Sequence, residues 1–176
     1  PKGDSPEHPD LRTGVPPTVD QLTAARARHE RKMMFLDGIT RQLGQQRRLA
    51  LRTGRQFLVM GDLNVAHTRA DVRNWGPAQH SAGFLPQERA WLDALISPRT
   101  LVDVVRRLHP GETGPYSWWS WMGQAFDRDT GWRIDYHLAS PALAKLALTA
   151  GTDKEPSSTG RVSDHSPVVV DYGMSM

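Results

Sequence analysis

Apolar residues in this chain alternate between helical spacing and short continuous runs, a pattern that favours a layered α/β domain. The first helix is predicted to begin near Val19, after the N-cap residue Thr18, and to end at Gly54. Its apolar positions recur mostly at intervals of three and four residues: Leu22, Met33, Leu36, Ile39 and Leu43. The apolar run at 57–60 (FLVM) then predicts a buried strand.

Shorter elements follow. A second helix is predicted to open at Phe84, with Pro86 in its first turn, and to stop at Pro98. Trp91 lies on its apolar side, so we expect this tryptophan in the core. Residues 101–108 predict another short amphipathic piece.

Two aromatic-rich segments, 116–121 (YSWWSW) and 132–138 (WRIDYHL), predict a pair of strands. Alternation divides the second segment into two faces: Trp132, Ile134 and Tyr136 on one, Arg133, Asp135 and His137 on the other. A small helix is predicted from Pro141 through Leu146, and residues 168–170 (VVV) predict a last buried strand. The long polar connection at 67–83 shows no clear element, and a loop of this length is more often functional or mobile than accidental.

The composition is that of one compact domain, because 38% of the 176 residues are hydrophobic and 23% are charged. Residues 1–17 read as an irregular lead-in. There is no cysteine, which excludes disulfides and thiolate metal sites. No charged-then-apolar leader opens the sequence and no membrane-spanning run occurs, so we expect a cytoplasmic protein without a membrane partner.

The net charge is only +3, but basic residues concentrate in the first helix and just after it. Between residues 21 and 55 they are Arg26, Arg28, Arg31, Lys32, Arg41, Arg47, Arg48, Arg52 and Arg55, against Glu30 and Asp37 alone. Such a face suits phosphates. A solvated helix face explains the same pattern equally well.

Candidate chemistry begins where the first strand ends, at the sequence Gly61-Asp-Leu-Asn64. Asp62 and Asn64 are two positions apart on an extended segment, so their side chains point to the same side. At the mouth of an α/β sheet, this pair could hold a metal, a water and a phosphate oxygen. The alternative is an ordinary turn, because Gly, Asp and Asn are common turn residues.

Two further polar groups lie at strand ends: Asp135, and Asp164 with His165. A charge such as Asp135 inside an apolar strand is costly unless it is paired, whereas Asp164 before His165, Ser166 and Pro167 could be simple turn chemistry. His67, His80 and His137 have no spacing that argues for a zinc site, so we interpret them as structural.

Phosphodiester hydrolysis needs such a set of groups. A divalent cation neutralises the anionic phosphate, and hard cations such as Mg²⁺ take carboxylate, water and phosphate oxygens. Asp62 could act as the base that activates water. Asn64 or a protonated His165 could stabilise charge on the phosphoryl oxygens, with Asp135 as the carboxylate partner that orients the imidazolium.

Five motifs in register carry a family resemblance. They are GDLN at 61–64, GFLPQER at 83–89, YSWW at 116–119, GWRIDYHLAS at 131–140 and SDHSPVVVDY at 163–172. Together they resemble the exonuclease III family of class II abasic-site endonucleases, within the endonuclease/exonuclease/phosphatase superfamily. The resemblance implies an α/β fold, a DNase I-like two-sheet sandwich flanked by helices, with the site at one edge where the sheets meet.

The resemblance also implies roles for individual residues. Asp62 would be the water-activating carboxylate, Asn64 a phosphate-binding side chain, and Asp135 the partner of His165. On the metal side it implies Asp62, Asn64 and Asp164. Residues that would contact DNA are Arg73, Asn74 and Trp75 in the 67–83 loop, Trp118, Trp132 and Ile134 in an apolar pocket for a flipped-out abasic sugar, and Met122 in the minor groove.

One departure from the family pattern stands out. The family's first strand carries an Asn, the next a metal-binding Glu, and a catalytic Tyr follows later; nothing in residues 1–17 matches them. We therefore expect residues 18–176 to be the C-terminal portion of a single domain of this superfamily, lacking its N-terminal part.

The sequence thus predicts a DNA-repair nuclease that uses Mg²⁺ or Mn²⁺. It would remove nucleotides from 3′ ends and cut 5′ of abasic sites in double-stranded DNA, as a monomer when the domain is complete. One alternative is a phosphoesterase for a soluble phosphoester; the other is a catalytically incomplete fragment that at most binds nucleic acid.

Overall fold

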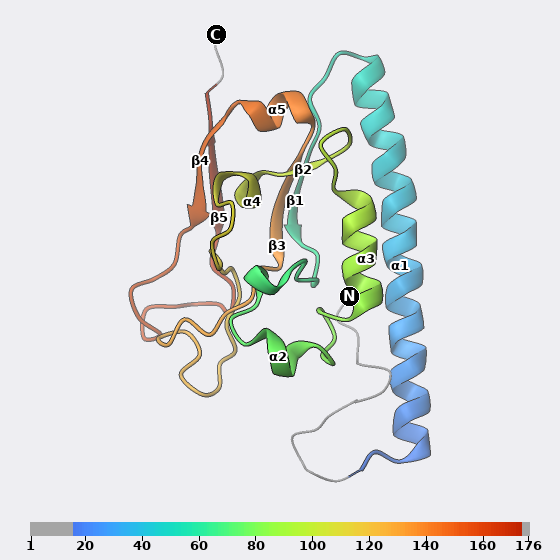
Figure 1. The fold of residues 1–176 in the computed structure, drawn as a ribbon, viewed down its shortest axis with the longest axis vertical. Helices are drawn as coiled ribbons and strands as arrows, with labels where there is room; N and C mark the ends of the chain where they lie inside the picture. Colours follow the sequence, from blue (N-terminus) through green and yellow to red (C-terminus); the bar gives the residue numbers. More distant parts are fainter. Residues whose placement is uncertain (1–15, 174–176) are drawn as a thin grey trace.

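The computed structural model describes residues 16–173 and contains two antiparallel sheets with helices packed around them (Figure 1). The predicted α/β class is confirmed. Residues 1–15, most of the expected irregular lead-in, lie outside the described residues. None of the helices within residues 16–173 combines the length and the apolar character that crossing a lipid bilayer requires.

The longest element is helix α1, Val19–Arg52, which runs along one side of the molecule (Figure 1). Thr18 caps it as predicted: its hydroxyl accepts a hydrogen bond from the Gln21 backbone N–H, and the Gln21 side chain accepts one from the Thr18 N–H. Gly54 follows the helix with φ +67°, in the left-handed region that glycine adopts without strain. Both predicted ends of this helix are therefore confirmed.

The first sheet has the strand order β1-β3-β2, with β1 at Leu58–Asp62, β2 at Val102–Asp103 and β3 at Asp135–Ala139. Leu58 lies opposite Ala139, and Asp62 lies opposite Asp135. The two carboxylates that the sequence singles out therefore end neighbouring strands at the same edge. In the predicted strand at 132–138, only the part from Asp135 onward is regular, so Arg133 escapes the predicted alternation and is buried.

Helices α1 and α3, the latter Pro86–Leu95, cover one face of this sheet. The main core joins buried residues of both helices with Tyr136 and Leu138 of β3. Trp91 is buried there as predicted, and its indole N–H donates to the Leu36 carbonyl and the Thr40 hydroxyl of α1. Pro86 occupies the first turn of α3, also as predicted.

A second core lies on the other face, under α4 (Val104–Leu108) and α5 (Pro141–Lys145). It extends to the second sheet, which pairs β4, Ala147–Thr152, with β5, Val168–Tyr172. The prediction that residues 168–170 form a fully buried strand is wrong, because Val169 is 47% exposed. Alternate residues of β5 turn towards the core, and the others face solvent.

Two sequence predictions need correction. Residues 116–121 do not form a regular strand; only Trp118 makes isolated bridges, to Trp132 and to His165. The reason is that Ser117 and Trp118 both donate to the Trp132 carbonyl, which breaks the ladder.

The connection at 67–83 is not devoid of structure either. It contains the 3₁₀ turn η2 (Arg69–Asp71) and the short helix α2 (Trp75–Ala78). Asp71 at the end of η2 is fully buried, so polar residues in this connection serve the interior and not only solvent.

Candidate active site

Asp62 and Asn64 form a tight turn at the end of β1. Asn64 has φ +51°, a left-handed conformation that Asn tolerates better than most residues. Its backbone N–H donates to Oδ1 of Asp62 at 2.7 Å, and its Nδ2 donates to Oδ2 at 2.5 Å. The two side chains are therefore in contact through a turn, the alternative that the sequence left open, and not on an extended segment; two donors fix the orientation of the carboxylate.

The Asp62 carboxylate sits opposite that of Asp135 in the β1–β3 pairing. Asp62 keeps an exposed surface, but surrounding protein partly desolvates its carboxylate. This desolvation raises the pKa of Asp62, the hydrogen bond from Asn64 lowers it, and the Asp135 charge raises it again, leaving the pKa above its usual value. A raised pKa makes Asp62 a better proton acceptor than an ordinary aspartate.

Asp135 and His165 are brought together from segments thirty residues apart. Nδ1 of His165 lies 2.8 Å from Oδ2 of Asp135, and both side chains are partly buried. Ser117 supports the arrangement, because its hydroxyl accepts the backbone N–H groups of Ile134 and Asp135 and its carbonyl accepts the N–H of Ser166. The contact predicted between Asp135 and His165 is present in the structure.

Asp164 lies next to this pair and is anchored through Trp118. The Trp118 indole N–H donates to Oδ2 of Asp164 at 3.0 Å, and the Asp164 carbonyl accepts the Trp119 N–H at 2.9 Å. The 116–119 segment thus runs between Trp132 on one side and 164–166 on the other, and it aligns both of them.

An apolar pocket of about 140 Å³ adjoins the Asp62–Asn64 turn. Its walls include Asn64, Gly83 and the three residues predicted to form a pocket, Trp118, Trp132 and Ile134. The two tryptophan rings meet edge to face, with centroids 6.3 Å apart, and Phe84 packs edge-on against Trp132. The structure therefore brings Trp118, Trp132 and Ile134 together beside the carboxylates.

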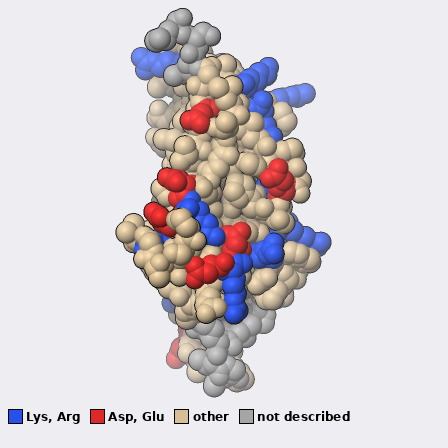
Figure 2. All heavy atoms as spheres, turned by 90° about the vertical axis from the view of Figure 1, so that its left-hand side faces the viewer, with Lys and Arg blue, Asp and Glu red and all other residues tan. Residues whose placement is uncertain are grey.

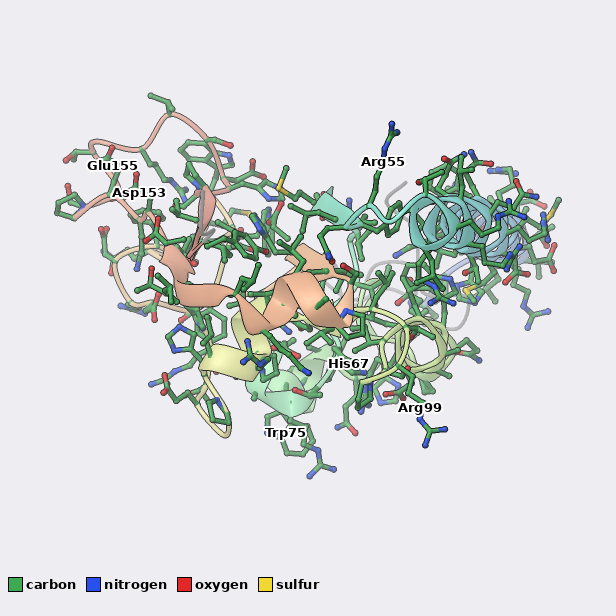
Figure 3. The ribbon with its side chains drawn as sticks, turned by 90° about the horizontal axis from the view of Figure 1, so that it is seen from above. Arg55, His67, Trp75, Arg99, Asp153 and Glu155 are labelled. Carbon is green, nitrogen blue, oxygen red and sulfur yellow. The ribbon has the colours of Figure 1, made fainter. Side chains whose placement is uncertain are left out.

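The other predicted DNA-contacting residues are less close to this pocket. Asn74 and Met122 line a neighbouring open hollow of about 550 Å³, which also borders Trp118 and Trp132, and the Met122 side chain is 60% exposed. Arg73 is exposed. Trp75 extends outward from the ribbon (Figure 3), with the Arg69 guanidinium 4.0 Å from its ring centroid. Arg73 and Trp75 line neither hollow.

Buried ion pairs that sequence reasoning missed hold these segments in place. Arg133, 1% exposed, donates to Asp71 and with both terminal nitrogens to Asp103. Arg106 also donates to Asp71. Burial alone would raise the pKa of Asp71, but the Arg133 charge and the hydrogen bonds from both arginines lower it to about 2. This network joins the residue before Ile134 to the 67–83 connection.

A second buried pair lies below the Asn64 turn. Nζ of Lys32 contacts Oε1 of Glu88 at 2.6 Å and donates to the Asn64 carbonyl at 2.9 Å. One signal in the sequence pointed to it: Lys32 falls one helical turn before Leu36, on the apolar side of α1. A lysine at such a position needs a buried partner.

Oxygen donors for a hard cation are present but do not form a closed ligand set. Within residues 16–173, no group of three or more His, Cys, Asp or Glu side chains is placed to hold a metal ion. Oδ1 of Asp164 has no hydrogen-bond donor among these residues. Mg²⁺ usually takes one or two protein carboxylates and keeps several waters, so a site with fewer than three such side chains is compatible with this ion.

Charges on the face around β4 and β5 are mixed. Figure 2 shows acidic and basic side chains in contact over the lower half of this face. Lys154 pairs there with Asp129 at 2.9 Å. This face therefore offers no uniformly basic surface to a polyanion.

Comparison with known sequences gives a consistent result. The model of the Endonuclease/Exonuclease/phosphatase family matches residues 2–165. The chain is 38% identical over 120 residues to an exodeoxyribonuclease of Bacillus subtilis, covering 68% of this chain and 46% of that protein. It is 34% identical over 114 residues to the DNA repair nuclease APEX1 of Danio rerio, covering 65% and 35%. The chain thus spans less than half the length of these relatives.

Solved structures agree with the sequences. A 3′ phosphatase from Neisseria, bound to a product DNA hairpin, superposes with a TM-score of 0.72 and 26% identity, covering 84% of this chain and 55% of that one. The AP endonuclease of Leishmania major gives a TM-score of 0.56 at 31% identity, covering 65% and 34%. The predicted DNase I-like sandwich class is therefore confirmed.

Proposed function

This chain belongs to the endonuclease/exonuclease/phosphatase family, and from that premise we propose that it is part of a DNA-repair nuclease that hydrolyses phosphodiester bonds. The observation that carries the proposal is the Asp135–His165 contact of 2.8 Å, directly across the sheet from the doubly hydrogen-bonded Asp62. Similarity to an exodeoxyribonuclease and to APEX1 supports DNA as the substrate.

In the proposed mechanism Asp62 accepts a proton from the attacking water, for which its raised pKa suits it. His165, oriented through Nδ1 by Asp135, presents its other ring nitrogen to a phosphoryl oxygen. Asn64 fixes the direction of the Asp62 carboxylate. In this mechanism Asp62 accepts the proton, Asn64 and Asp135 orient the reacting side chains, and His165 contacts the phosphate, all at one edge of the sheet.

We propose Mg²⁺ as the metal of this family's metal-dependent chemistry, with Mn²⁺ as a substitute. Asp164 and Asp62 would supply protein oxygens, and Asn64 would complete the predicted set. When bound, such an ion neutralises the phosphate and the leaving oxygen. We further propose a monomeric, cytoplasmic enzyme.

We propose that the pocket makes the enzyme selective for its DNA substrate. A space of about 140 Å³ bordered by Trp118, Trp132 and Ile134 offers a mainly apolar surface to a small group, such as a deoxyribose that lacks its base. We therefore propose incision 5′ of abasic sites together with 3′-to-5′ removal of nucleotides. A highly charged soluble phosphoester fits these apolar walls less well.

The test uses the purified protein that carries this chain. One duplex would contain a single abasic analogue, a second would have a recessed 3′ end, and each would be incubated with Mg²⁺ or with EDTA. We expect Mg²⁺-dependent incision 5′ of the analogue and stepwise shortening of the 3′ end. Cleavage of inositol phosphates in place of both duplexes would contradict the DNA assignment.

A second candidate function is nucleic-acid binding without catalysis. It is favoured by one observation, the lack of a three-ligand metal group within residues 16–173. The same experiment separates the two functions: tight binding of the abasic duplex without Mg²⁺-dependent cleavage would support the second candidate.

A further inference from the structure

The pair formed by Lys32 of α1 and Glu88 of α3 is buried more completely than Asp62, Asp135 and His165. The Lys32 side chain is 1% exposed and that of Glu88 is fully buried, with a distance of 2.6 Å between Nζ and Oε1. Removing two charges from water costs free energy that their attraction does not reliably return. Stability alone is therefore a weak explanation for such a pair at this position.

The remaining hydrogen bonds of the pair go to the walls of the pocket. Nζ of Lys32 donates to the Asn64 carbonyl at 2.9 Å, and Oε2 of Glu88 accepts the N–H groups of Gly83 at 2.7 Å and Leu85 at 3.0 Å. The Gly83 carbonyl in turn accepts the N–H of Ala66 at 2.7 Å. One ion pair is thus hydrogen-bonded to two segments that border the pocket, one at Asn64 and the other at Gly83.

Gly83 is closely packed against Asn64 and Trp132. Gly83 has φ +94°, and a Cβ atom there would lie 3.2 Å from the Asn64 carbonyl oxygen and 3.3 Å from the Trp132 ring. The Asn64 backbone is therefore held from two sides, by the Lys32 ammonium and by close packing against Gly83. Its left-handed φ of +51° costs free energy in an Asn, so it persists because these neighbours fix it.

We propose that Lys32 and Glu88 are positioning residues for the candidate active site: the buried pair holds the Asn64 backbone so that the Asn64 side chain stays on Asp62. This proposal rests on the proposed function. It assigns a role in catalysis to two residues that do not touch the reacting atoms, and it predicts that the pair affects turnover more than substrate binding.

A double variant isolates this role. Lys32→Met removes the donor to Asn64, and Glu88→Gln removes the opposite charge while the introduced amide oxygen can still accept the Gly83 and Leu85 N–H groups. No buried charge is left uncompensated, so the double variant is expected to fold. The double variant loses the Lys32–Glu88 ion pair and the tether to the Asn64 carbonyl, and it replaces one residue that lines the pocket.

Turnover and binding are then measured on the abasic duplex. We expect kcat to fall about 10- to 100-fold, because small misplacements of catalytic groups carry losses of this size, while KM changes less than about threefold. The control is Leu36→Val, a core change one helical turn along α1 that leaves the Lys32–Glu88 pair in place. Measured below its unfolding temperature, the control should keep the wild-type kcat.

Amide hydrogen exchange provides a second readout that does not depend on activity. In the double variant, the Asn64 N–H, which is bonded to Asp62, should exchange about tenfold faster or more, while the Gly83 N–H keeps its protection. An inactive wild-type protein would reject the proposed function but leave this exchange test intact.

Two outcomes overturn the inference. The first is a folded double variant with kcat within about twofold of the wild type and unchanged Asn64 exchange. The second is an equal loss of kcat in Leu36→Val, which would show that α1 acts through general stability.

Discussion

At the scale of single residues, the candidate site depends on opposed effects on one carboxylate. Asp62 is partly desolvated and faces Asp135 across the sheet, which favours its protonated form, yet two donors from Asn64 favour its charged form. The net raised pKa makes the Asp62 carboxylate a stronger proton acceptor than an ordinary aspartate. A general base requires this balance.

The first prediction concerns Asp62→Asn in the protein that carries this chain. Because the amide cannot accept the proton, single-turnover cleavage of the abasic duplex should fall by about 10²- to 10⁴-fold. Binding of the duplex, measured by fluorescence anisotropy, should change little. The control is Asp37→Asn, the same chemical change on the exposed side of α1. Retention of more than about a tenth of the activity would show that Asp62 is not the base.

The second prediction concerns the buried Asp71. Its folded pKa of about 2 lies below the ordinary value of 3.8, so its contribution to stability is present above about pH 4 and is lost as pH falls towards 2. This difference corresponds to about 2 kcal/mol. Urea unfolding should therefore show the stability gap between the wild type and Asp71→Asn narrowing over this range.

For Asp71, Asp37→Asn again provides the matched control, because its carboxylate is on the exposed side of α1 and not within an arginine network. Its stability should follow the wild type from neutral pH down to about pH 2. A constant gap between wild type and Asp71→Asn over the same range would mean that Asp71 is not held ionised by Arg133 and Arg106.

At the scale of elements, the sequence predicted the helix starts that depend on neighbouring residues. The capping box at Thr18, the start of α3 at Pro86 and the small helix α5 at Pro141 follow from neighbouring residues, and all three are present. Residues 116–121 failed because aromatic composition favours a strand, whereas a doubly used carbonyl at Trp132 limits pairing to Trp118. Sequence spacing does not show such a nonlocal effect.

Predictability of the site divides in the same way. The Asp62–Asn64 turn is local, and the four residues at 61–64 offered it as the alternative to an extended segment. The Asp135–His165 contact and the pocket of Trp118, Trp132 and Ile134 join residues that are far apart in the chain. Sequence spacing does not show that such residues meet, so these features were predicted with the help of the family resemblance. The Arg133 network was not, since a buried Asp71 looks like any polar loop residue.

The third prediction contrasts two glycines. Gly83→Ala places a side chain at φ +94° and against the Asn64 carbonyl, so it should destabilise the protein by about 1–3 kcal/mol. Gly38→Ala lies within α1, where a Cβ meets only the flexible end of Arg41 at 4.0 Å, so it should stabilise by about 0.5–1 kcal/mol. Urea unfolding of both variants checks the signs. Equal effects would contradict the fixed backbone at Gly83.

The fourth prediction concerns the contact between α1 and α3. Lys32→Met alone leaves the Glu88 carboxylate buried without its cation, which should lower the free energy of unfolding by about 3–5 kcal/mol. Adding Glu88→Gln removes the uncompensated charge and should recover at least about 2 kcal/mol. A double-mutant cycle by urea unfolding measures the difference. Additive losses would show that the two residues do not act as a pair.

The arginines of α1 leave one interpretation open at this scale. Arg41, Arg48 and Arg52 are exposed. Viewed from above, Arg55 and Arg99 near the end of α1 point in different directions (Figure 3), although both border one hollow of about 370 Å³ together with Arg47. A solvated helix face and a phosphate-binding face both remain consistent with this arrangement.

At the scale of the whole molecule, the candidate site lies where three separate parts meet. The end of β1 supplies Asp62, the bridged segment around Trp118 supplies the pocket, and the turn before β5 supplies Asp164 and His165. The chain spans less than half the length of its curated relatives. Among the residues that the structure describes, no three or more His, Cys, Asp or Glu side chains form a group that is placed to hold a metal ion.

The last prediction concerns the affinity of this open ligand set for Mg²⁺. With no three-ligand metal group within residues 16–173, Mg²⁺ alone should bind weakly and raise the unfolding temperature by less than about 1 °C at about 5 mM. A DNA phosphate adds oxygens to the shell, so Mg²⁺ should tighten binding of a non-hydrolysable abasic duplex about tenfold or more, and DNA should tighten Mg²⁺ binding equally. Anisotropy titrations with Mg²⁺ and with EDTA measure this coupling. Asp164→Asn should reduce it, whereas the surface control Asp37→Asn should not. A Mg²⁺ dissociation constant below about 10 μM without DNA would contradict the open ligand set, because such affinity requires several protein ligands.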